Sequence, residues 1–123
     1  MSHPPNYIIA ISSVSGGGKT TLVKRTADIL RGTALFFDDY AAVSEYPPDI
    51  KKWVEDGADV NDWQTPQFAK DLAALRRGDS IVSPIDGASI LSSEFIVIEE
   101  PMGRERAEMV SLIDFVAVID TPL

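Results

Sequence analysis

The sequence predicts an α/β fold in three layers, with a mainly parallel sheet of at least four strands and helices on both faces of the sheet. Three observations carry this prediction. Four short apolar runs suit buried strands, and segments with the apolar spacing of helices separate them. The runs end in acidic residues or in a glycine-rich loop. Because open α/β sheets bind ligands beyond the carboxyl ends of their strands, we expect the functional site at this edge.

The first third of the chain predicts a strand, a helix and a second strand. Tyr7–Ile11 is an apolar run followed by a glycine cluster. A helix is expected from about Lys19 to Leu30, because its apolar residues keep helical spacing, and Gly32 is suited to stop it. Ala34–Phe37 predicts the second strand, which should end at the acidic pair Asp38-Asp39.

The middle of the chain is less regular and then predicts a clear helix. Tyr40–Asn61 contains two adjacent prolines, with a short helix expected at Asp49–Glu55. A longer helix should begin with Thr65 as its N-cap residue and Pro66 in its first turn. Gly78 is expected to end this helix.

The last third predicts a hairpin and two more buried strands. Two short apolar runs flank Asp86-Gly87, a turn dipeptide, so we expect a hairpin over Ile81–Leu91. Phe95–Ile98 and Phe115–Ile119 predict the third and fourth strands, and a short helix should cover Arg104–Leu112 between them.

Composition limits the classes of function that fit. The 123 residues suffice for a single domain over residues 1–123, and 19 acidic against 11 basic residues give a net charge of -8. This balance argues against nucleic-acid partners and against docking on anionic membranes. With no cysteine, disulfides and thiolate chemistry are excluded. We find neither a membrane span nor a signal peptide, and a cytoplasmic location is the default expectation.

A phosphate-binding loop is the most specific motif in the sequence. The window Ser13–Thr20 follows the pattern G-x-x-x-x-G-K-[ST] except that Ser13 replaces the first glycine. In such loops, glycines let backbone N–H groups surround phosphate oxygens at the start of a helix. Lys19 would reach the β- and γ-phosphates, and the Thr20 hydroxyl would bind Mg²⁺. We therefore predict binding of a nucleoside triphosphate, ATP, by Ser15, Gly16, Gly17, Gly18, Lys19, Thr20 and Thr21.

Acidic residues at the predicted strand ends supply the other candidate groups. Phosphoryl transfer to a hydroxyl needs a carboxylate that accepts or orients the hydroxyl proton. Asp38 is the candidate base, with Lys19 as the other catalytic residue, and Asp39 could help to hold the metal. Glu99 is the candidate metal-site acid, and the adjacent Glu100 could take this role instead. The alternative for each acid is a plain strand-ending or turn residue.

Four larger side chains are weaker candidates for substrate contact. Arg104 and Arg106 follow the third predicted strand and could meet a substrate or a phosphate, although surface arginines are common. Trp53 and Trp63 could stack on a base or a sugar, or could pack in the core.

These residues resemble the uridine kinase and phosphoribulokinase-like branch of P-loop kinases, which includes nicotinamide riboside kinases. The resemblance runs from Tyr7 to the end and rests on four segments: Ser15–Thr21, Phe37–Tyr40, Asp71–Gly78 and Ile96–Glu99. It implies a P-loop NTPase fold in which the loop strand is central, ATP and Mg²⁺ as cofactors, and a small-molecule acceptor such as a nucleoside. It also implies roles for the acids at positions 38 and 99, and an acceptor site shaped partly by the hairpin.

The sequence also departs from this family. Ser13 replaces a glycine, Glu100-Pro101 stands where a glycine often follows the acid, and Asp62 is only the nearest match to the ribose-binding acid. The family continues with an arginine-bearing lid and a fifth strand, so we expect the domain to be incomplete after Leu123. The prediction is an ATP- and Mg²⁺-dependent small-molecule kinase. The alternatives are a nucleotide-binding module with little transferase activity and, less favoured because the guanine-reading motif is absent, an NTP hydrolase.

Overall fold

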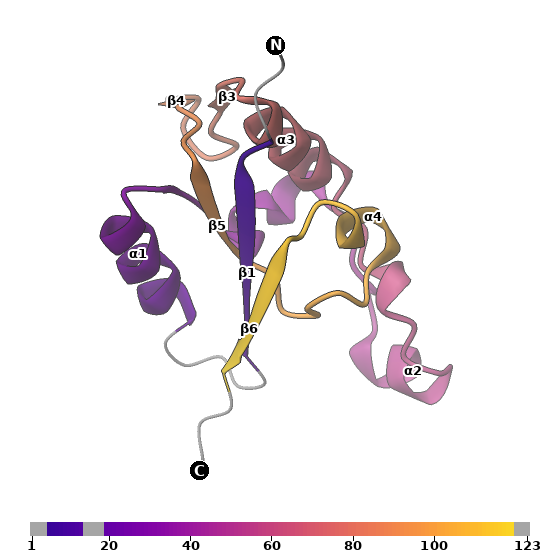
Figure 1. Cartoon of the computed structure of the whole chain (residues 1–123). Coiled ribbons are helices and arrows are strands. Elements are labelled where there is room, and N and C mark those ends of the chain that lie inside the picture. The colour runs from indigo at the N-terminus through magenta and orange to yellow at the C-terminus, as the bar shows by residue number, and fades with distance from the viewer. Residues whose placement is uncertain (1–4, 14–18, 120–123) are drawn as a thin grey trace.

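The computed structural model describes residues 5–13 and 19–119 of the chain (Figure 1). Its strands are β1 (Tyr7–Ser13), β2 (Thr33–Leu35), β3 (Ile81–Val82), β4 (Ser89–Ile90), β5 (Phe95–Glu99) and β6 (Phe115–Ile119). Its α-helices are α1 (Lys19–Leu30), α2 (Ile50–Glu55), α3 (Pro66–Arg77) and α4 (Ala107–Val110), and short 3₁₀ helices are η1 (Phe37–Val43) and η2 (Val60–Asp62). No helix in the described part of the chain is long and apolar enough to cross a membrane.

The main sheet is parallel, with the strand order β2-β5-β1-β6. β1 lies between β5 and β6, which confirms the prediction that the loop strand is an inner one. Its register pairs Ile11 with Glu99 on one side and Ser13 with Ile119 on the other. All four strands therefore end at one edge of the sheet, the lower edge in Figure 1.

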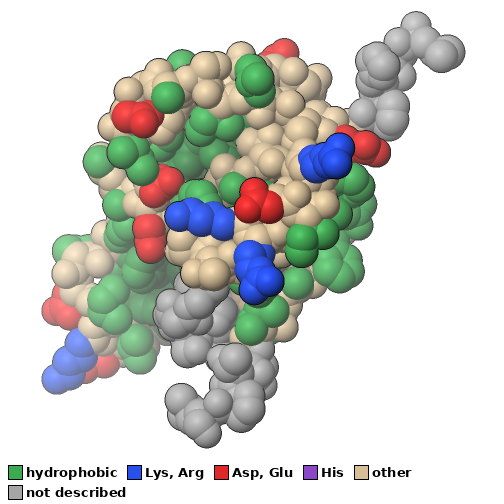
Figure 2. Space-filling view, turned by 90° about the vertical axis from the view of Figure 1, so that its left-hand side faces the viewer, with side chains coloured by type: hydrophobic (Ala, Val, Ile, Leu, Met, Phe, Trp, Pro, Cys, Tyr) green, Lys and Arg blue, Asp and Glu red, His purple; other side chains and the backbone are tan. Residues whose placement is uncertain are grey.

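Helices cover both faces of this sheet, as predicted. On one face, Val23 and Ala27 of α1 pack with Ile11 and Val97. On the other face, α3 and α4 pack against alternate residues of the same strands, and this larger core includes Ile8, Ala10, Ile96, Ile98, Phe68, Leu72, Leu75 and Met109. Alternation along each strand thus sends successive side chains to different helices. Figure 2 looks onto the α1 side, where acidic and basic side chains are intermixed.

The second strand is shorter than predicted. β2 ends at Leu35, and the segment expected to continue it to Asp38-Asp39 forms η1 instead. The reason is the spacing of buried residues: Phe37 and Tyr40 are both buried and lie three positions apart, which matches the period of a 3₁₀ helix. Asp38 and Asp39 therefore lie in the first turn of η1 and not at a strand end.

The residue before α3 is the predicted one, but it does not cap the helix with its side chain. Thr65 does precede the helix and Pro66 lies in the first turn, but the Thr65 side chain makes no capping hydrogen bond. Its hydroxyl instead donates to Glu108 at 3.1 Å. Helix α4, which lies between β5 and β6, is shorter than the expected Arg104–Leu112. The residues before Ala107 form turns and place Arg106 in the interior.

The hairpin forms as predicted but lies away from the carboxyl edge of the sheet. β3 and β4 pair antiparallel, Ile81 with Ile90. The C-terminal end of α3 and the hairpin lie near the start of β1, because α3 runs back along the sheet (Figure 1). There the Asn6 amide donates to the Leu75 carbonyl, and Arg76 forms an ion pair of 2.9 Å with Asp114. The structure therefore does not bring this hairpin to the predicted site.

Candidate active site

The candidate site is built where β1 and β5 end and α1 begins. Ser15, Gly16, Gly17 and Gly18 lie outside the described residues, and Lys19 opens α1 directly after them. Thr20 and Thr21 follow in the first turn. The Thr20 hydroxyl donates to the Glu99 carboxylate at 3.2 Å. Two residues predicted to serve the metal region, 79 positions apart in sequence, thus meet at the edge where nucleotide binding was predicted.

This pair fits a magnesium site of the kind that nucleotide-binding proteins use. Glu99 is only 3% exposed, and a buried carboxylate needs polar partners. Both groups offer oxygen ligands, which Mg²⁺ prefers. Within residues 5–13 and 19–119 no three acidic or histidine side chains gather as a metal site. A magnesium ion held by one or two side chains together with substrate phosphates is consistent with this arrangement.

Asp38 and Asp39 lie beside α1 in the first turn of η1. The Asp38 side chain is exposed. Burial raises the pKa of Asp39, the negative charge of Asp38 raises it further, and Lys24 of α1 lowers it. The two acids are therefore close enough to repel each other, and α1 supplies a positive charge beside them. Among the described residues, neither acid belongs to a cluster of metal-binding side chains with Glu99, so a shared metal site for Asp39 and Glu99 stays a prediction.

An aromatic hollow opens next to this turn. Its volume is about 390 Å³, within the usual range of small-molecule sites, and it is lined by Glu45, Tyr46, Pro47, Pro48, Asp49, Lys52, Trp53, Asp56 and Asp62. Asp62 and Trp53, both named from the sequence, are therefore brought together here. Trp63 packs behind them, with its ring 5.0 Å from Tyr46 and 5.6 Å from Trp53.

Tyr46 is a residue that the sequence analysis missed. Its ring stacks on Phe37 at 5.7 Å, which connects the hollow to the residue before Asp38. Burial raises the pKa of Tyr46, and the negative charges of Asp38 and Glu100 also raise it, whereas Ser44 and Arg106 lower it. No local pattern marks Tyr46, since it lies in the irregular segment between two helices.

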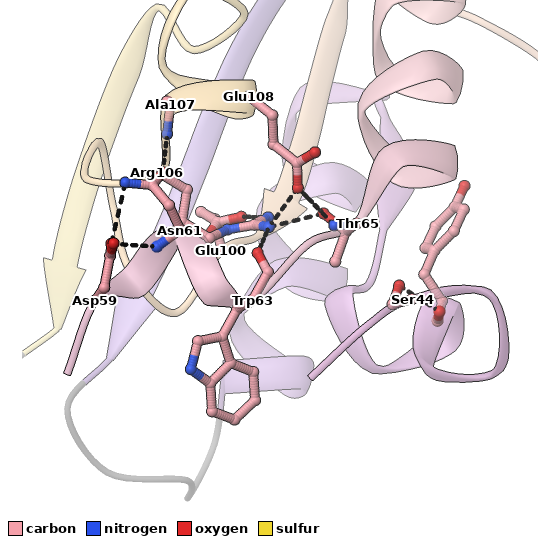
Figure 3. A network of polar contacts seen from close by, with 10 residues as sticks. Ser44, Asp59, Asn61, Trp63, Thr65, Glu100, Arg106, Ala107 and Glu108 are labelled. Atoms are coloured by element: carbon pink, nitrogen blue, oxygen red, sulfur yellow. Dashed lines mark hydrogen bonds and ion pairs between the residues drawn. The ribbon is translucent and has the colours of Figure 1, made fainter. Parts of the chain in front are cut away.

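The two arginines after β5 have different surroundings. Arg106 is completely buried, and its guanidinium binds the Glu100 carboxylate with hydrogen bonds of 2.8 and 2.6 Å (Figure 3). Arg104 donates to the carbonyls of Ile113 and Asp114, at the start of β6. Arg106 therefore faces the interior, and a substrate contact by Arg104 stays a prediction. Glu100 is engaged by Arg106, so Glu99, which contacts Thr20, fits the metal role better.

No family model matches the chain. Over 94% of its length the chain is 29% identical to the uridine kinases of Borrelia duttonii (strain Ly) and Borrelia recurrentis (strain A1), and it spans 61% of the length of each. The chain is therefore similar in sequence to uridine kinases. This confirms the resemblance to P-loop kinases of this branch that the sequence predicted.

The structural comparison agrees at the level of the fold. The solved structure of a possible uridine kinase from Bacillus stearothermophilus superimposes with a TM-score of 0.61 and 20% sequence identity. The superposition covers 99% of this chain and 74% of that one. The chain therefore shares the fold of that structure over nearly all of its length. It spans less than two thirds of the length of the two curated uridine kinases.

Proposed function

We propose that this protein transfers the γ-phosphoryl group of ATP to a hydroxyl of a nucleoside-type small molecule. The observation that carries the proposal is the contact between Thr20 and Glu99 at the carboxyl edge of the sheet, directly after the phosphate-loop sequence. The similarity to uridine kinases supports the same reaction class. Asp38, close to this edge and exposed, is available to a second substrate.

The proposed roles follow from the chemistry of each residue. The backbone of the loop from Ser15 to Gly18 and the Lys19 ammonium bind the phosphates of ATP. Mg²⁺, held by Thr20 and the Glu99 region, would neutralise charge on the β- and γ-phosphate oxygens. Asp38 takes the proton of the acceptor hydroxyl as its oxygen bonds to the γ-phosphorus, and the bond to ADP breaks.

The acceptor is proposed to bind in the aromatic hollow. Tyr46 and Trp53 offer ring faces for a planar base, and Asp62 offers a carboxylate for sugar hydroxyls. Trp63 does not line the hollow itself, but its ring packs against those of Tyr46 and Trp53 and supports them. Aromatic faces with a few polar groups are the usual composition of small-molecule sites.

Acceptor-dependent release of ADP tests this proposal. With ATP and Mg²⁺, uridine and other nucleosides should stimulate ADP release by the wild type. Asp38→Asn should lower the rate by about 10²–10⁴-fold, the usual contribution of a general base. Asp28→Asn, an exposed aspartate on α1, is the matched control. ADP release that needs no acceptor and is unchanged in Asp38→Asn would indicate hydrolysis, and saturable ATP binding with no release would indicate a nucleotide-binding module.

The acceptor hollow has a separate test. Trp53→Ala should raise the KM for a nucleoside acceptor by about tenfold, because base-aromatic stacking contributes about 1–3 kcal/mol. The affinity for ATP should not change. Val54→Ala, an exposed neighbour on α2, is the control and should leave both values unaltered. An unchanged KM for the acceptor in Trp53→Ala would place the acceptor elsewhere.

A further inference from the structure

Arg106 lies at the centre of a buried network of hydrogen bonds. Its exposure is 0%, and each of its guanidinium nitrogens donates within the protein. Nε and Nη2 bind the two oxygens of Glu100, while Nη1 binds the Trp63 carbonyl at 2.8 Å, the Thr65 hydroxyl at 2.8 Å and Glu108 at 2.9 Å. Figure 3 shows these bonds converging from the ends of different elements.

The partners of Arg106 are the chain neighbours of candidate site residues. Glu100 directly follows Glu99, and Trp63 directly follows Asp62. The guanidinium also lies over the ring of Phe37, 5.2 Å from its centroid, and Phe37 directly precedes Asp38. One side chain thus contacts the three segments that carry the metal-side acid, the acceptor-side acid and the candidate base.

The same segments are joined by a second layer of hydrogen bonds. Glu108, beside Arg106, accepts from both the backbone N–H and the hydroxyl of Thr65. The Asn61 side chain accepts from the backbone N–H of Ala107 at 2.8 Å. Both ends of the segment from Asn61 to Thr65 are therefore fixed to the first residues of α4.

A buried ion pair is poor evidence for stability, because removing two charges from water offsets much of their attraction. Its best-attested use is to specify one arrangement of the groups around it. Arginine suits this role because its planar fork binds a carboxylate through two bonds and still presents a third nitrogen in a fixed direction. A lysine could not bind Glu100, Trp63 and Thr65 in the same geometry.

We propose that Arg106 is a positioning residue for the phosphoryl-transfer site, and that with Glu100 it sets the separation between Glu99 on one side and Asp38 and Asp62 on the other. This inference rests on the proposed function, because it assigns those three acids to opposite sides of the reacting phosphate. Arg106 touches no substrate in this role. Misplacement of reacting groups by as little as about 1 Å can lower rates by about 10²-fold.

The decisive variant replaces the pair with apolar residues of similar volume, Glu100→Leu with Arg106→Met. Such replacements of buried ion pairs commonly leave a protein folded. Thermal unfolding establishes that the double variant folds, and Arg106→Lys is the conservative companion. Arg77→Lys, an exposed arginine on α3, is the matched control.

The expected result is a folded double variant with kcat at least about tenfold below that of the wild type and a dissociation constant for Mg·ATP within about twofold of it. Wild-type kcat and acceptor KM in the folded double variant would overturn the positioning role and leave the proposed function intact. If the wild type itself shows no acceptor-dependent turnover, the proposed function fails.

A spectroscopic readout tests the anchoring without turnover. In a Trp53→Phe background, the fluorescence of Trp63 reports on the segment that Arg106 holds. Acrylamide should quench the Trp63 fluorescence more strongly when Glu100→Leu and Arg106→Met are added than in the parent protein, which carries Trp53→Phe alone. The reason is that the Trp63 carbonyl has lost its hydrogen-bond donor. Equal quenching in the two proteins would overturn the inference, and Arg77→Lys should quench like the parent.

Discussion

At the scale of single residues, Arg31 and Gly32 have different roles in the turn between α1 and β2. Arg31 has a φ of 53°, so it takes the left-handed position that ends α1. The N–H of Gly32 then bonds to the Ala27 carbonyl at 2.7 Å. A Cβ on Gly32 would lie 2.5 Å from the Phe95 carbonyl oxygen. Gly32 follows the helix as the sequence predicted, but the need for glycine comes from its close approach to β5.

Substitution of these two neighbours should change stability in opposite directions. Arg31→Gly should stabilise the fold by about 1 kcal/mol, because a left-handed conformation costs a residue with a Cβ about 1–2 kcal/mol. Gly32→Ala should destabilise it by about 1–3 kcal/mol through overpacking against backbone. Urea unfolding of both variants measures the difference. A destabilising Arg31→Gly together with a neutral Gly32→Ala would contradict this account.

Asp39 should make the stability of the protein depend on pH. Its pKa is raised above 3.8 by burial and by Asp38, so the folded protein holds this proton more tightly than the unfolded chain. Stability from this group is therefore complete below pH 3.8 and is lost as the pH rises through the raised pKa. Asp39→Asn removes that loss and should be more stable than the wild type at pH 7.

Thermal unfolding between pH 3.5 and 7 checks this prediction. The advantage of Asp39→Asn should shrink as the pH falls toward about 3.8, the ordinary pKa of aspartate. Asp28→Asn removes the same charge from an exposed position on α1 and controls for net charge. An advantage for Asp39→Asn that grows as the pH falls would have the wrong sign.

At the scale of elements, one buried hydrogen bond holds η1 against α3. The Tyr40 hydroxyl donates to Asp71 at 2.7 Å, and Gln67 donates to the other oxygen of the same carboxylate at 2.8 Å. Burial raises the pKa of Tyr40, and its hydrogen bond to Asp71 raises it further, so the hydroxyl remains a donor. Because Asp38 lies in the same 3₁₀ helix, this bond also holds the candidate base.

Loss of this bond should be costly. Tyr40→Phe should destabilise the protein by about 1.5–3 kcal/mol, the range for a hydrogen bond to a charged group, because Asp71 keeps its charge and loses a donor. Tyr7→Phe, a 41% exposed tyrosine, is the matched control and should change stability by less than about 0.5 kcal/mol. Urea unfolding gives both values. Equal effects of the two substitutions would contradict a structural role for the Tyr40–Asp71 bond.

At this scale, sequence patterns predicted the elements well where local chemistry decides them. α1 occupies the predicted positions, and Gly78 ends α3 in the left-handed conformation that glycine favours. The patterns did not predict local structure that depends on contacts with residues distant in the sequence. The turn of η1 depends on packing of Phe37 and Tyr40 against Phe68, and Thr65 prefers Glu108, 43 positions away, to its own helix.

At the scale of the whole molecule, the sequence predicted the parallel sheet and its covered faces. It also predicted that Thr20 and Glu99 serve one site, and their side chains meet. It could not reveal the network of Arg106, whose bonds to Trp63 and Thr65 join residues 43 and 41 positions apart. It also missed Tyr46, because only the folded chain brings that ring onto Phe37.

The central claim is that the edge carrying Thr20 and Glu99 binds a magnesium nucleotide. Titration calorimetry with Mg·ATP tests it most directly, using the wild type, Lys19→Ala and, as the matched control, Lys70→Ala on the exposed side of α3. We predict saturable binding that needs Mg²⁺, is lowered at least about tenfold by Lys19→Ala and is unchanged by Lys70→Ala. Absence of saturable binding to the wild type, or equal binding by Lys19→Ala, would contradict the account.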